Sequence, residues 1–88
     1  MVVRGKSRTR FSVQADYEVN TLSRVLELFT IRGLACDTLH AKRTTDGLHW
    51  IELDCSDIED QHAGVVMNKL RQIVTVRSVR VETTMLAA

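Results

Sequence analysis

The sequence predicts a single α+β domain with the element order βαββαβ, in which two helices cover one face of a four-stranded antiparallel sheet. Two stretches carry apolar residues at helical spacing, and the stretches around them alternate apolar and polar residues. An Asp-Gly pair at 46–47 adds a hairpin turn between the second and third strands. The 88 residues suffice for one such domain, and without proline no element has an internal breaker.

Four alternating segments are the predicted strands, and they cover residues 10–16, 34–45, 48–55 and 75–83. Phe11, Val13 and Ala15 share one face of the first strand, so that strand is expected to be half buried. Two right-handed split βαβ units then give the strand order 4-1-3-2. We expect the domain to cover residues 9–84, after a flexible basic tail over residues 1–8.

Capping signals and apolar stripes locate the two helices. Asn20 is the predicted N-cap of the first helix, because its side-chain oxygen can accept a hydrogen bond from a free helix amide, and Gly33 is expected to end that helix. Ser56 and Glu59 form a predicted capping box before the second helix. The helix stripes consist of Leu22, Val25, Leu26 and Phe29, and of Ala63, Val66, Met67, Leu70 and Ile73. The predicted core consists of Phe11, Val13, Ile51, Leu53 and Val79 from the sheet and Leu26, Phe29, Val66 and Leu70 from the helices.

Composition excludes several classes of function. Twelve basic and eleven acidic residues give a net charge of +1, which is not the clustered positive charge of a nucleic-acid-binding protein. No apolar run approaches the roughly 18 residues of a membrane span, and the start lacks the long apolar stretch of a signal peptide. We therefore expect a cytoplasmic protein. The three histidines and two cysteines show no metal-ligand spacing, so no metal site is predicted.

One edge and one face of the predicted sheet lack cover. The second strand is an edge, and an exposed edge invites pairing with another chain. The face away from the helices carries Trp50, a large apolar side chain. We therefore expect a homodimer paired through the second strand. The alternative for this face is stacking of an RNA base on Trp50, but the first strand contributes only Ser12 and Gln14 there.

Several short segments stand in a familiar order and spacing, at residues 21–26, 32–34, 51–53, 68–70 and 74–76. The most specific are the run Leu22-Ser23-Arg24-Val25 and the pair Arg32-Gly33 that closes the same helix. Over roughly residues 10 to 82 the chain resembles the small subunit of acetolactate synthase, in its short form made of one ferredoxin-like ACT domain. It is most similar to the valine-insensitive isozyme type.

This resemblance implies a non-catalytic regulatory subunit that binds and activates the acetolactate synthase large subunit in branched-chain amino-acid biosynthesis. Thiamine diphosphate, Mg²⁺ and FAD would belong to the large subunit, so this chain is expected to hold no cofactor. The alternative is a free-standing amino-acid-binding ACT sensor that is not tied to this enzyme. The neighbouring coding sequence would distinguish the two, because a regulatory subunit is expected beside its large subunit.

The resemblance also implies an amino-acid site between two ACT domains, and no catalytic residues. The residues carried over are Tyr17, Glu18, Asn20, Thr21 and Leu22 in the turn before the first helix, and Ala35 and Cys36 at the start of the partner's second strand. Tyr17 stands where valine-sensitive members usually have Asn, and Asn20 where they have Gly. Glycine would let a ligand carboxylate approach the helix amides, whereas the Asn20 side chain is expected to cap them itself. The expected result is weak or absent valine binding.

Overall fold

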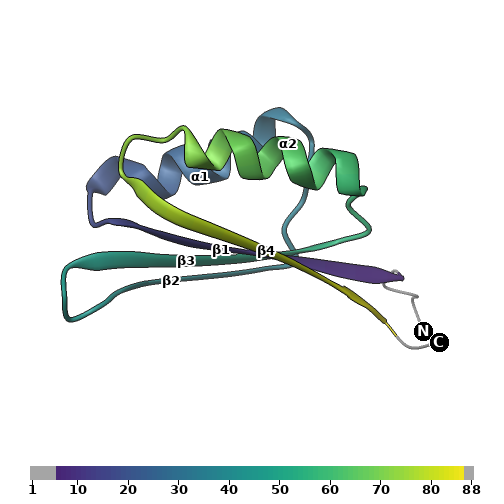
Figure 1. Ribbon diagram of the computed structural model, residues 1–88, viewed down its shortest axis with the longest axis horizontal. Coiled ribbons are helices and arrows are strands. Elements are labelled where there is room, and N and C mark those ends of the chain that lie inside the picture. Colours follow the sequence, from purple (N-terminus) through teal and green to yellow (C-terminus); the bar gives the residue numbers. More distant parts are fainter. Residues whose placement is uncertain (1–5, 87–88) are drawn as a thin grey trace.

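A computed structural model describes residues 6–86 and confirms the predicted architecture (Figure 1). The elements are β1 (Ser7–Asp16), α1 (Val19–Ile31), β2 (Thr38–Arg43), β3 (Leu48–Ser56), α2 (Asp60–Arg71) and β4 (Val76–Met85). The strands form one antiparallel sheet in the order β2-β3-β1-β4, which is the predicted order read from the other edge. Both helices lie on the same face of this sheet, and the other face is left open (Figure 1).

The core lies between the helices and the two central strands, as predicted. Phe11 pairs with Leu53 across β1 and β3, and both side chains are fully buried. The Phe11 ring meets Phe29 of α1 edge to face, with 5.1 Å between the ring centroids, which is a favourable geometry for two aromatic rings. Leu26 and Val79 are half-buried at the margin of this core.

Both helices begin at residues other than those predicted. Asn20 is the second residue of α1, and the N-cap is Glu18, whose side chain makes no capping hydrogen bond. The predicted capping box does not form, because Ser56 ends β3 and α2 begins only at Asp60. The Ser56 hydroxyl donates instead to the Asp37 carboxylate. A partner from a distant segment has replaced the local backbone amide as the hydrogen-bond partner.

The first strand begins earlier than expected, because Asp57 holds its start. The Asp57 carboxylate accepts hydrogen bonds from the backbone amides of Lys6 and Ser7, at 2.9 and 3.1 Å. The Asp57 amide donates in return to the Ser7 carbonyl at 3.1 Å. Ser7 and Arg8 therefore belong to the sheet rather than to the tail expected over residues 1–8. Residues 1–5 of that expected tail lie outside the described residues.

The second strand is shorter than predicted. Residues 34–37 close the end of α1 and connect it to β2, which begins only at Thr38. The Leu34 amide donates to the Phe29 carbonyl at 2.9 Å, and the Gly33 amide donates to the Thr30 carbonyl at 3.0 Å. These two bonds form a Schellman motif, in which Gly33 has a φ of 67°. Gly33 thus ends α1 as the sequence predicts.

Two glycines, Gly33 and Gly64, have open space where a Cβ atom would lie. Alanine at these two positions is nevertheless expected to change the free energy of unfolding in opposite directions. Gly33→Ala is expected to lower the free energy of unfolding by about 1 to 2 kcal/mol, because φ is left-handed there. Gly64→Ala, within α2, is expected to raise it by about 0.5 to 1 kcal/mol through helix propensity. Urea titration of both variants checks the pair, and a stabilised Gly33→Ala would contradict the role of Gly33 as the helix stop.

Candidate effector site

The first turn of α1 borders a small depression of about 200 Å³. Its lining residues are Glu18, Asn20, Thr21 and Arg24 from the start of α1, and Ile73, Val74 and Thr75 from the connection between α2 and β4. The Thr21 side chain is buried, and its hydroxyl lies 2.8 Å from the Thr75 hydroxyl. The Thr75 carbonyl also accepts a hydrogen bond from the Asp16 amide at 2.8 Å. These contacts hold the turn before α1 against the start of β4.

Three of the predicted site residues, Glu18, Asn20 and Thr21, therefore share one depression. Leu22 does not line it, because its side chain packs against the hydrophobic core. No side chain caps the start of α1 in the described part of the chain, so the expected competition of Asn20 for the helix amides is wrong. Asn20 still lines the depression beside that helix turn.

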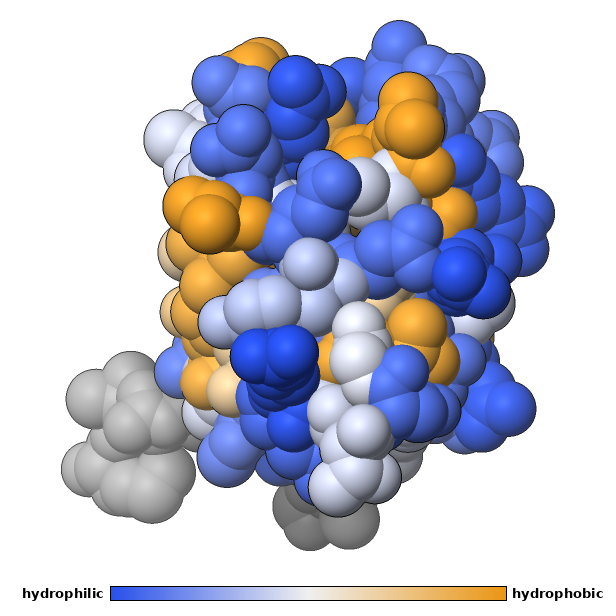
Figure 2. Space-filling model, turned by 90° about the vertical axis from the view of Figure 1, so that its left-hand side faces the viewer, coloured by the Kyte–Doolittle hydropathy of each residue, from blue (hydrophilic) through white to orange (hydrophobic). Residues whose placement is uncertain are grey.

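Tyr17 faces the β2–β3 hairpin rather than the depression. Its ring lies on His49 of β3 with 4.9 Å between centroids, and the guanidinium of Arg43 lies 4.8 Å from the Tyr17 ring centroid. Arg43 is the last residue of β2, so the contact has the geometry of a cation–π interaction between the turn before α1 and the end of the edge strand. Figure 2 views this end of the molecule, where hydrophobic patches are separated by polar side chains.

Ala35 and Cys36 do not approach the other candidate residues within one chain. They lie in the connection that leaves the far end of α1, and a helix of 13 residues is about 20 Å long. Figure 1 shows this connection descending from the end of α1 that is distant from the β1–α1 turn. Both halves of the expected site can meet only between two chains.

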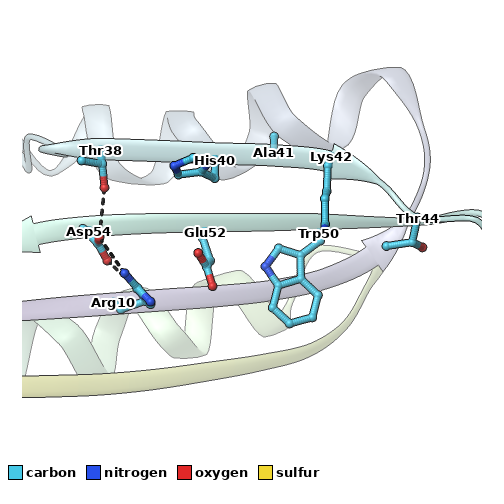
Figure 3. A pocket seen from close by; sticks show the side chains of 9 residues that line it. All are labelled: Arg10, Thr38, His40, Ala41, Lys42, Thr44, Trp50, Glu52 and Asp54. Carbon is cyan, nitrogen blue, oxygen red and sulfur yellow. Dashed lines mark hydrogen bonds and ion pairs between the residues drawn. The ribbon is translucent and has the colours of Figure 1, made fainter.

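The open face of the sheet holds a broad groove of about 720 Å³. The sequence indicated this face only through the large apolar side chain of Trp50. Its lining residues are Arg10, Thr38, His40, Ala41, Lys42, Thr44, Trp50, Glu52 and Asp54 (Figure 3). Trp50 and Lys42 lie toward one end, and an ion-paired cluster lies at the other (Figure 3). The charged residues at alternate, outward positions of β2 and β3 were the signal available in the sequence.

Asp54 is the centre of that cluster. Its carboxylate accepts hydrogen bonds from Arg10 Nε at 2.9 Å, from the second Arg10 nitrogen at 3.2 Å and from the Thr38 hydroxyl at 3.0 Å. The hydrogen bond from Arg10 lowers the pKa of Asp54, and desolvation by burial opposes this in part. The ionised carboxylate therefore joins β1, β2 and β3 across the open face.

The lowered pKa of Asp54 predicts how stability depends on pH. A group with a depressed pKa in the folded state stabilises the fold above its unfolded pKa of about 3.9, and this contribution is lost as the pH falls through the folded pKa. Asp54→Asn is thus expected to be destabilised relative to the wild type at pH 6, with a smaller difference at pH 3. Urea titrations at both pH values measure this, and an equal difference at both would contradict it.

The described residues 6–86 contain no group of three or more His, Cys, Asp or Glu side chains that could hold a metal ion. No helix among them is long and apolar enough to cross a membrane.

The fold and the depression beside α1 define a class of small α+β domains in which two helices cover one face of a four-stranded antiparallel sheet. The sequence matches the model of the ACT-like domain over residues 4–88, so the chain belongs to the ACT-like domain family. No curated protein matches the sequence.

Solved structures share this fold. The ACT domain of GTP pyrophosphokinase from Chlorobium tepidum has a TM-score of 0.74 at 13% identity, over 85% of this chain and 96% of that one. The C-terminal domain of MgtC from Mycobacterium tuberculosis has a TM-score of 0.76 at 8% identity, over 100% of this chain and 98% of that one. The regulatory subunit of aspartate kinase from Thermus thermophilus has a TM-score of 0.70 at 9% identity, over 88% of this chain and 50% of that one.

Proposed function

We propose that this chain is a non-catalytic regulatory subunit that pairs with a second copy of itself and activates the large subunit of acetolactate synthase in the cytoplasm. The family supports a regulatory role. The resemblance of α1, from Leu22-Ser23-Arg24-Val25 to Arg32-Gly33, supports the choice of enzyme. Thiamine diphosphate, Mg²⁺ and FAD would be held by the large subunit, and this chain would supply an amino-acid effector site.

The observation that carries the proposal is the contact of Arg43 with Tyr17, because it joins the candidate turn to the end of β2. If β2 pairs with β2 of a second copy in antiparallel fashion, the start of one strand lies beside the end of the other. Ala35 and Cys36, just before β2 in one chain, then approach the Tyr17 turn of its partner. In such a dimer the two halves of the candidate site would lie close together.

The exposed edge supports this pairing. All six residues of β2 are exposed. Leu39 and Ala41 lie opposite the buried Leu53 and Ile51, so their side chains project toward the helix layer. Figure 3 shows the Ala41 side chain pointing away from the other side chains of the groove. Cross-strand partners share one face of a sheet, yet these two apolar side chains remain uncovered. A second copy on this edge would extend the sheet and cover them.

The test of the proposal is reconstitution with the large subunit encoded in the same genome. We expect the chain alone to form no acetolactate from pyruvate, and the mixture to exceed the large subunit alone several-fold. Arg24 is suited to a variant because it is exposed and makes no side-chain hydrogen bond or ion pair in the described residues. Arg24→Gln should weaken activation, whereas Arg71→Gln on α2 should not. Amino-acid binding without any activation would favour the free-standing sensor instead.

The effector site has its own expected result. Valine binding to the wild type should be weak or absent, because Asn20 lines the depression and carries a side chain where glycine would leave the first turn of α1 open to a ligand. Asn20→Gly should strengthen it, and Asn20→Gln, which keeps a side chain there, should not. Calorimetric titration measures this. A micromolar dissociation constant for the wild type would show that Asn20 does not block the site.

A further inference from the structure

The only two cysteines of the chain lie side by side. The Sγ atoms of Cys36 and Cys55 are 3.8 Å apart, although the two residues are 19 positions apart in the sequence. Cys36 precedes β2 and Cys55 belongs to β3, and both are free thiols. We propose that Cys36 and Cys55 form a dithiol site that low-molecular-weight disulfides oxidise to a reversible intrachain disulfide.

The backbone holds the two segments that carry the thiols together. The Asp37 amide donates to the Asp54 carbonyl at 2.7 Å, and Asp37 and Asp54 are the sequence neighbours of Cys36 and Cys55. This bond keeps the connection that carries Cys36 against β3, so the two sulfur atoms need to approach by only about 2 Å to reach the bond length of a disulfide.

The two thiols differ in structural context and in access to solvent. Cys55 is fully buried and is fixed in the sheet opposite Thr9. Cys36 is half-buried and lies in the connection between α1 and β2, outside any regular element. A small movement of this connection closes the gap between the sulfur atoms, and solvent reaches Cys36 first.

The order of reaction follows from this asymmetry. The Cys36 thiolate attacks one sulfur of oxidised glutathione, forms a mixed disulfide and releases one glutathione thiolate. The Cys55 thiolate then attacks the sulfur of Cys36, forms the intrachain bond and releases the second glutathione. The protein loses two electrons and two protons, and one oxidised glutathione becomes two reduced molecules.

Burial sets the rate of both steps. It raises the pKa of the Cys36 thiol and raises that of Cys55 to about 12. Because the thiolate is the attacking species, oxidation should be slow near neutral pH and faster as the pH rises. The second step is intramolecular, so the closeness of the two sulfur atoms offsets the lower acidity of Cys55 and the mixed disulfide should not accumulate.

The disulfide would hold the α1–β2 connection against β3. On the proposed function, that connection carries Ala35 and Cys36, the half of the effector site that one chain lends to its partner. Oxidation would then change effector binding or activation. This consequence rests on the proposed function, whereas formation of the bond does not.

The test is incubation of the native, reduced chain with oxidised glutathione at pH 7 and pH 9. Mass spectrometry should show a product lighter by two hydrogen atoms, with loss of both free thiols, and a faster reaction at pH 9. Dithiothreitol should restore both thiols. Peptide mapping should join the segments that contain Cys36 and Cys55.

Two variants separate the steps. Cys55→Ser should accumulate one glutathione on Cys36, and Cys36→Ser should remain unmodified while folded. Circular dichroism establishes that each is folded, and Cys55→Ala replaces Cys55→Ser if the buried hydroxyl prevents folding. A persistent glutathione adduct on the wild type, a disulfide between chains, or reaction only after unfolding would each overturn the proposal. None of these results depends on the large subunit, so they are distinguishable from failure of the proposed function.

Discussion

Phe11→Ala is expected to remove most of the stability of the fold. The Phe11 side chain is fully buried in the central strand β1 and meets Phe29 edge to face. Truncation of a buried Phe costs about 3 to 5 kcal/mol, through lost burial and the cavity that remains. Small domains have a total stability of only about 5 to 15 kcal/mol, and a chain of this length lies toward the lower end.

The measurement is urea unfolding followed by circular dichroism. Val74→Ala is the matched control, because Val74 is 96% exposed and its truncation should change stability by less than about 0.5 kcal/mol. A folded Phe11→Ala with a loss near that of the control would show that the contact between β1 and α1 is not central to the core.

Leu39→Lys is expected to convert the proposed homodimer into a monomer. Leu39 lies on the exposed edge strand β2 and is 41% exposed in the single chain. A symmetric interface contains the side chain twice, so the variant loses two apolar contacts and gains two charges there. Loss of about 1.5 kcal/mol for each copy weakens the dimer by about a hundredfold.

Sedimentation velocity over a range of concentrations measures this effect. Met85→Lys is the matched control, because Met85 is a 72% exposed apolar residue on β4, the opposite edge of the sheet. The control should remain dimeric. Dissociation of Met85→Lys with an intact Leu39→Lys dimer would place the interface at β4 instead.

Local signals were sufficient for the architecture. The alternation around Phe11 and the helical stripe around Phe29 identify their buried faces, because side-chain periodicity depends only on the type of element. Gly33 ends α1 and Gly47 turns the hairpin, both with positive φ, because the left-handed region favours glycine irrespective of distant contacts.

Long-range partners decided what the local signals could not. Ser56 and Asp57 resemble a helix start in the sequence, yet they bond to Asp37 and to the start of β1. The same holds for Tyr17, whose ring packs on His49 instead of lining the depression beside α1. A polar or aromatic side chain with two possible partners takes the one that the assembled sheet brings close.

The sequence by itself therefore determined the element order, the strand order and the core of this ACT-like domain, because periodicity and glycine conformations are local properties. Only the tertiary structure decided where the helices begin, which candidate residues share the depression, and that Cys36 lies beside Cys55. Those features depend on contacts between residues 19 or more positions apart. Pairing of β3 with β1 and β2 brings such residues together, so a local stretch of sequence does not reveal them.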